Sequence, residues 1–140
     1  MRFSTFINLS VLFLFFTIIG GCQEKEYISQ ETYYPSGSVE SQTIYVDGKR
    51  DGLQKFFYED GTLASQILFV DDFKQGEFKA WFHSGTLKLV ANYRDGKLQG
   101  ESTQYYEGGK MRLKERYDNG ELIYQKKYTT DGKVEYEDNY

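Results

Sequence analysis

Hydrophobic and polar residues alternate along most of the chain, and the alternation recurs about every 24 residues. Glycines mark one column of the repeat at Gly37, Gly61, Gly85, Gly109 and Gly132, the last after a step of 23. Four residues before them lies an aromatic column, here called the aromatic stripe: Tyr33, Phe57, Trp81, Tyr105 and Tyr128. Period-two alternation predicts strands, and a lag shared by several columns predicts a tandem array. The pattern therefore predicts an all-β chain of successive hairpins.

Two turn signals punctuate each repeat. The first slot holds pairs such as Asp60-Gly61, and the second holds Asp47-Gly48, Asp71-Asp72, Asp95-Gly96 and Asn119-Gly120. Such dipeptides are typical of two-residue primed turns, and that turn fixes which residues face each other. Applied to the first slot, it places Tyr34 opposite Val39, Tyr58 opposite Leu63, Phe82 opposite Leu87 and Tyr106 opposite Met111.

The same register divides the sheet into an apolar face and a polar face. The apolar face gains Phe56, Ile67, Phe69 and Phe78 and is expected to be the core side. The polar face carries the aromatic stripe, opposite Glu40, Ala64, Lys88, Arg112 and Glu135. A single sheet of about nine short strands lacks a second layer, so it must curl over itself, stack on a second copy as a homodimer, or receive a partner.

These columns resemble the bacterial variant of the membrane occupation and recognition nexus (MORN) repeat. The match runs from Phe57-Tyr58-Glu59-Asp60-Gly61-Thr62-Leu63 through Tyr93-Arg94-Asp95-Gly96-Lys97-Leu98-Gln99-Gly100. It covers roughly Tyr33 to Tyr136. The resemblance implies an elongated antiparallel sheet of hairpins over residues 33–140, with four repeats and a partial fifth. Some bacterial members of this family are labelled antitoxin-like.

The first 21 residues form a different kind of segment. Met1-Arg2 is followed by an apolar run from Phe3 to Ile19 without acid or base, and Gly20 and Gly21 precede Cys22. This layout is typical of a cleaved signal peptide. Ile19-Gly20-Gly21-Cys22 also resembles the bacterial lipobox, which implies that Cys22 is lipidated and becomes the new N-terminus. The alternatives are an ordinary signal peptide or a buried thiol at the end of a membrane helix.

Residues 22–32 are then interpreted as the lipidated N-terminus and a polar tether. The position after Cys22 holds Gln23 and not the aspartate that retains many Gram-negative lipoproteins in the inner membrane. This favours the outer membrane. The chain carries a formal net charge of −4, and an acidic chain rarely offers the clustered cationic face that nucleic acid requires. We expect a protein of the bacterial cell envelope that binds no nucleic acid.

Reactive constellations are sparse in this sequence. Cys22 is the only cysteine and His83 the only histidine, so no second histidine or free thiol of the mature chain completes a catalytic triad or a zinc site. His83 also occupies a turn-flanking column that holds Pro35, Glu59 and Glu107 in other repeats, which does not favour a catalytic role. Asp71-Asp72 suits a solvated turn better than a calcium site. We therefore expect no cofactor, no metal and no enzymatic activity.

The aromatic stripe is the candidate binding site. A structural role would include cation–π pairs such as Trp81 with Lys88 and Tyr105 with Arg112. A functional role would make the stripe a docking strip, because Tyr, Trp and Arg are enriched where interfaces concentrate their energy. The leading hypothesis is a lipid-anchored protein-binding scaffold, in a narrower version antitoxin-like or immunity-like. The alternatives are a self-associating structural lipoprotein and a glycan- or phospholipid-binding module.

Overall fold

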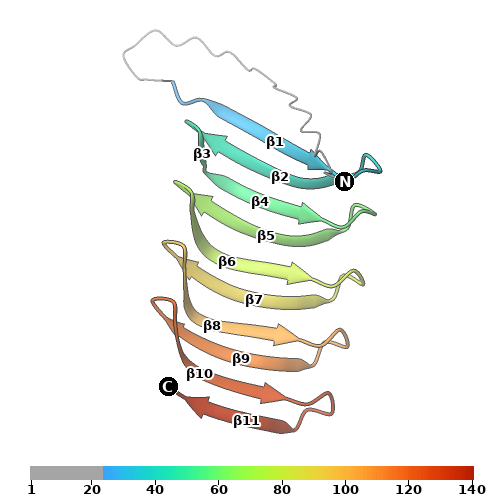
Figure 1. The fold of residues 1–140 in the computed structure, drawn as a ribbon, viewed down its shortest axis with the longest axis vertical. Helices are drawn as coiled ribbons and strands as arrows, with labels where there is room; N and C mark the ends of the chain where they lie inside the picture. Colours follow the sequence, from blue (N-terminus) through green and yellow to red (C-terminus); the bar gives the residue numbers. More distant parts are fainter. Residues whose placement is uncertain (1–23) are drawn as a thin grey trace, which may run out of the picture.

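The computed structural model describes residues 24–140, which form one antiparallel sheet with the strands in chain order (Figure 1). The strands are β1 (Tyr27–Tyr33), β2 (Val39–Val46), β3 (Lys49–Arg50), β4 (Gly52–Phe57), β5 (Leu63–Val70), β6 (Phe73–Trp81), β7 (Leu87–Arg94), β8 (Lys97–Tyr105), β9 (Met111–Asp118), β10 (Glu121–Tyr128) and β11 (Val134–Asn139). The expected all-β array of hairpins is confirmed. The sheet begins at Tyr27, within the stretch interpreted as a tether.

The first turn of each repeat is longer than the two-residue turn predicted from the sequence. In the turn after β4, the Tyr58 amide donates to the Thr62 carbonyl at 2.8 Å, and the Gly61 amide donates to the Tyr58 carbonyl at 2.9 Å. Gly61 has a φ of 85°, whereas Asp60 is absent from the positive-φ residues. This is a three-residue loop with glycine in the left-handed position, the second most common hairpin connection. The prediction of a primed two-residue turn was wrong at this slot.

The second turn of each repeat is the primed turn expected from its sequence. Asp95 and Gly96 have φ angles of 50° and 79°, and Asp71 and Asp72 have 49° and 70°. Two consecutive positive φ angles define the type I′ turn, whose twist matches that of the flanking strands. These hairpin tips also bond to the preceding hairpin, since the Gly96 amide donates to the Lys74 carbonyl at 3.0 Å.

The core of the array is small because no second layer covers the sheet. The buried hydrophobic residues among 24–140 are Val46, Ile67, Phe69 and Ala91. Ile67 and Phe69 lie on the face expected to be the core side, and the Arg50 guanidinium covers the Phe69 ring at 4.2 Å from its centroid. Phe56, placed on the same face, remains 40% exposed. Side chains of neighbouring hairpins thus bury part of one face and leave the rest accessible.

Candidate functional site

The aromatic stripe lies where strands enter the glycine turns. Tyr33, Phe57, Trp81, Tyr105 and Tyr128 are the last residues of β1, β4, β6, β8 and β10, respectively. All five side chains are half-buried, so each presents part of its ring to solvent. Because successive hairpins stack in chain order, the stripe extends along the whole array.

The structure gives the stripe a different set of cross-strand partners from those expected. A register shift next to each glycine turn pairs the aromatic residue with the first residue of the following strand. Directly opposed residues share a face. The partners are Val39, Leu63, Leu87, Met111 and Val134, not Glu40, Ala64, Lys88, Arg112 and Glu135. The stripe is therefore a double row of aromatic and aliphatic side chains.

The displaced residues turn to the other face of the sheet. The Thr32 hydroxyl donates to a Glu40 carboxylate oxygen at 3.2 Å, and Glu135 accepts from the Lys127 ammonium at 2.9 Å. Lys88 Nζ lies 5.6 Å from the centroid of the Phe82 ring. The expected cation–π pair between Trp81 and Lys88 was therefore wrong, because the longer turn adds a residue that rotates Lys88 away. The same shift pairs Tyr105 with Met111 instead of Arg112.

A second aromatic column holds the backbone of the stripe in place. The hydroxyls of Tyr34, Tyr58 and Tyr106 donate hydrogen bonds of 2.7–2.8 Å to the carbonyl oxygens of Phe57, Trp81 and Tyr128 in the next hairpin. Phe82 occupies this column without a hydroxyl. Sequence reasoning missed this role, although the recurrence of tyrosine beside the stripe was a signal for it.

Polar contacts fix the N-terminal end of the stripe. The Tyr33 hydroxyl donates to Glu31 Oε2 at 2.6 Å, and Gln42 Nε2 donates to Glu31 Oε1 at 2.8 Å. These hydrogen bonds stabilise the carboxylate and lower the pKa of Glu31, while the bond to Glu31 raises the pKa of Tyr33. Tyr33 is thereby held as a neutral hydrogen-bond donor in one orientation.

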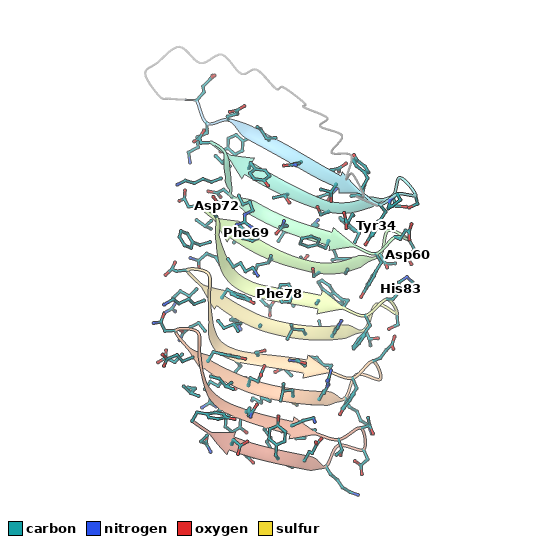
Figure 2. The ribbon with its side chains drawn as sticks, viewed as in Figure 1. Tyr34, Asp60, Phe69, Asp72, Phe78 and His83 are labelled. Carbon is teal, nitrogen blue, oxygen red and sulfur yellow. The ribbon has the colours of Figure 1, made fainter. Side chains whose placement is uncertain are left out.

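The single histidine bridges two adjacent glycine turns (Figure 2). His83 Nε2 lies 3.0 Å from Asp60 Oδ2, and its ring meets the Tyr58 ring edge-on at 5.0 Å between centroids. Asp60 also accepts hydrogen bonds from the hydroxyl and the amide of Thr62, at 2.7 and 2.9 Å. These contacts, led by the Thr62 hydroxyl, lower the pKa of Asp60. The geometry gives His83 a role in linking hairpins.

The paired acids at the β5–β6 turn are engaged by bases of the preceding hairpin. Lys49 Nζ lies 3.0 Å from Asp71 Oδ1, and Arg50 Nε lies 2.9 Å from Asp72 Oδ1. Arg50 holds the pKa of Asp72 below its usual range. Within residues 24–140, no group of three or more His, Cys, Asp or Glu residues is arranged to hold a metal ion.

The predicted lipid attachment site, Cys22, and the signal peptide at 1–21 lie outside the described residues. Across residues 24–140, the structure contains no helix with the length and apolar character of a membrane span.

The comparison with protein families agrees with the repeat architecture. Residues 28–47, 50–71, 74–95 and 98–119 match the MORN repeat variant in four consecutive copies. No curated protein matches this chain. Because the four copies cover more than half of the sequence, the chain belongs to the MORN repeat variant family.

Proposed function

We propose that this protein is a non-enzymatic, lipid-anchored scaffold of the bacterial cell envelope that binds another protein through its aromatic stripe. The observation that carries the proposal is the direct pairing of five half-buried aromatic residues with five aliphatic residues in one continuous double row. Aromatic and aliphatic side chains in such a row supply the anchors on which protein interfaces depend.

The backbone of the stripe supports this proposal because it is held by hydrogen bonds before any partner arrives. The tyrosine bonds to the carbonyls of Phe57, Trp81 and Tyr128 restrain the strands that carry the aromatic rings. A preorganised surface loses less conformational entropy on binding. An extended row suits an extended segment or a helix of a partner better than a small molecule, which needs a concave site.

The proposed lipid anchor and the proposed location in the cell are supported by the sequence alone. The lipobox-like Ile19-Gly20-Gly21-Cys22 supports lipidation of Cys22, and Gln23 favours the outer membrane in a Gram-negative cell. The narrower version, an antitoxin-like or immunity-like protein that masks a secreted toxin, rests on the resemblance to antitoxin-like members of the family.

The test is crosslinked capture from envelope and secreted extracts, with the partner identified by mass spectrometry. Trp81→Ser with Tyr105→Ser is expected to weaken capture of one stoichiometric protein at least tenfold while the chain stays folded. A matched control, Glu59→Ser with Glu107→Ser, changes exposed residues in the turns that follow β4 and β8 and should leave capture unchanged. Equal capture by both double variants would show that the stripe is only scaffold.

Self-association is a second candidate, favoured by the incomplete cover of the apolar face. Phe56 on that face is 40% exposed, and four hydrophobic residues are buried in the described part of the chain. A homodimer stacked through this face would supply the missing layer. Light scattering at several protein concentrations would reveal the homodimer, because the measured mass would rise from that of one chain to that of two as the concentration increases.

A further inference from the structure

A second apolar surface lies at the other end of the strands, near the type I′ turns of the first two repeats. Its members, here called the tip patch, have exposed fractions of 37–55%: Ile44, Leu53, Leu68, Val70 and Phe73. Leu53 pairs directly with Leu68, and Val70 pairs directly with Phe73. Leu68 and Val70 alternate along β5, so these four side chains share one face. Ile44 lies on the same face. Gln42 pairs with Lys55 across β2 and β4, and Ile44 and Leu53 each lie two positions from a member of that pair, towards the same end of the strands.

The array itself shows that the fold does not require apolar residues at these positions. In the third and fourth repeats, Asn92 and Arg116 occupy the column of Leu68, and Lys97 and Glu121 occupy that of Phe73. Those polar residues sit exposed on strands of the same sheet. Only the first two repeats expose large apolar side chains here. A contiguous exposed apolar patch that the fold does not need marks a contact surface.

Two ion pairs lie beside the tip patch. Lys49 pairs with Asp71 and Arg50 pairs with Asp72 on the adjoining hairpin tips. A surface whose charges are paired loses less on approaching an apolar phase than one with isolated charges. These two ion pairs therefore lower the cost of bringing the hairpin tips to lipid.

The first strand begins at the same end of the strands as the tip patch. Tyr27, the first residue of β1, pairs with Val46, the residue before the Asp47-Gly48 turn. Tyr27 is itself 67% exposed. Cys22 precedes Tyr27 by five positions, a contour of at most about 18 Å. A lipid on Cys22 would hold the first two hairpin tips close to the bilayer.

We infer that the tip patch docks onto the bilayer that holds the acyl chains of Cys22, so that the array stands on the tips of its first two hairpins. This inference rests on the proposed lipid anchor. Interfacial side chains enter a bilayer by about 5–10 Å. Along β5, Val70 of the patch and Leu63 of the double row are separated by roughly 23 Å, at about 3.3 Å per residue. Leu53 of the patch and Phe57 of the stripe lie on the same face of β4, so the stripe remains free for a protein when the strands stand upright on the bilayer and not when this face lies flat on it.

The test uses the full chain, expressed with its lipid and reconstituted into phosphatidylethanolamine–phosphatidylglycerol vesicles with nitroxide-labelled acyl chains. Phe73→Cys is compared with Lys97→Cys, the same repeat position one unit later. A thioether-linked lipid on Cys22 leaves the introduced cysteine as the only free thiol for a fluorescent label. The label at position 73 is expected to lose at least half of its emission to the lipid quencher, whereas that at 97 keeps its emission.

Introducing Leu68→Asn with Val70→Asp should abolish quenching at position 73, because the patch loses two of its apolar side chains. The fold should tolerate both substitutions, because Asn92 and Asp118 already occupy these columns in later repeats. Thermal unfolding checks that this variant stays folded. Vesicles that float with the protein but leave the label at 73 unquenched would overturn this inference and preserve the anchor. Equal quenching at 73 and 97 would overturn it in favour of an array that lies flat. Failure to float, with an unmodified Cys22 by mass spectrometry, would overturn both the anchor and the inference.

Discussion

The Tyr58 hydroxyl crosses from one hairpin to the next and donates a 2.7 Å hydrogen bond to the carbonyl oxygen of Trp81. A repeat array gains its stability from contacts within repeats and between neighbours. This bond is one such neighbour contact, and it recurs where Tyr34 reaches Phe57 and Tyr106 reaches Tyr128. At the third repeat the column holds Phe82, so the carbonyl of Tyr105 receives no such hydroxyl.

We predict that Phe82→Tyr stabilises the array. The new hydroxyl should reach the Tyr105 carbonyl in the geometry that Tyr58 and Tyr106 already show, which is worth about 1 kcal/mol. Urea unfolding monitored by circular dichroism would measure the gain as a higher midpoint. Tyr58→Phe is the reciprocal control and should lose a similar amount. A destabilised Phe82→Tyr variant would show that the third repeat cannot adopt the bond.

Two adjacent glycines offer a test of the turn geometry. Gly109 has a φ of 80°, whereas Gly108 is absent from the positive-φ residues, and a Cβ on either would meet no atom within 4 Å. Gly109→Ala should therefore cost about 1–2 kcal/mol from backbone strain alone. Gly108→Ala should be neutral or stabilise the protein, because it restricts the unfolded chain. Equal effects on the free energy of unfolding would contradict the three-residue turn.

The ionisation of Asp60 should make the free energy of unfolding depend on pH. Its pKa is lowered in the folded protein, chiefly by the Thr62 hydroxyl, then by the Thr62 amide and the charge of His83. Its stabilising contribution is thus present above the unfolded pKa of about 3.9 and is lost as the pH falls through the lower folded pKa. NMR titration of the Asp60 carboxyl should show this low pKa, and Thr62→Val should raise it. The explanation fails if the Asp60 pKa is the same in both proteins.

The lipid anchor has its own test. Cys22→Ser should abolish incorporation of labelled fatty acid and move the protein from the membrane fraction to the soluble fraction. Replacing Ser29, a residue of β1, with alanine serves as a control that keeps both. Labelling that persists without Cys22 would refute the lipobox interpretation.

Sequence reasoning predicted the array because its signals are local. Asp47-Gly48, Asp95-Gly96 and Asn119-Gly120 adopt two consecutive positive φ angles, as their residue types favour, and such a tight turn fixes the pairing of its two strands. The pairing next to these turns, such as Arg94 opposite Lys97, therefore follows from the sequence. Across the Asp60-Gly61 turn, Phe56 still lies opposite Ser65 because the register shift beside Phe57 absorbs the extra turn residue. The aromatic stripe also appeared in the sequence, because each of its members recurs at one repeat position.

Only the tertiary structure decided what surrounds the stripe. The sequence of the Asp60-Gly61 slot suits both a two-residue and a three-residue turn, and one extra residue replaces Ala64 by Leu63 as the partner of Phe57. The tyrosine bonds and the His83–Asp60 bridge join residues more than 20 positions apart, so turn chemistry cannot reveal them. The exposure of Leu68 and Phe73 likewise depends on how a single-layer sheet covers its own faces. The sequence determined the repeat through local conformation, and the tertiary structure decided its surfaces through contacts between repeats.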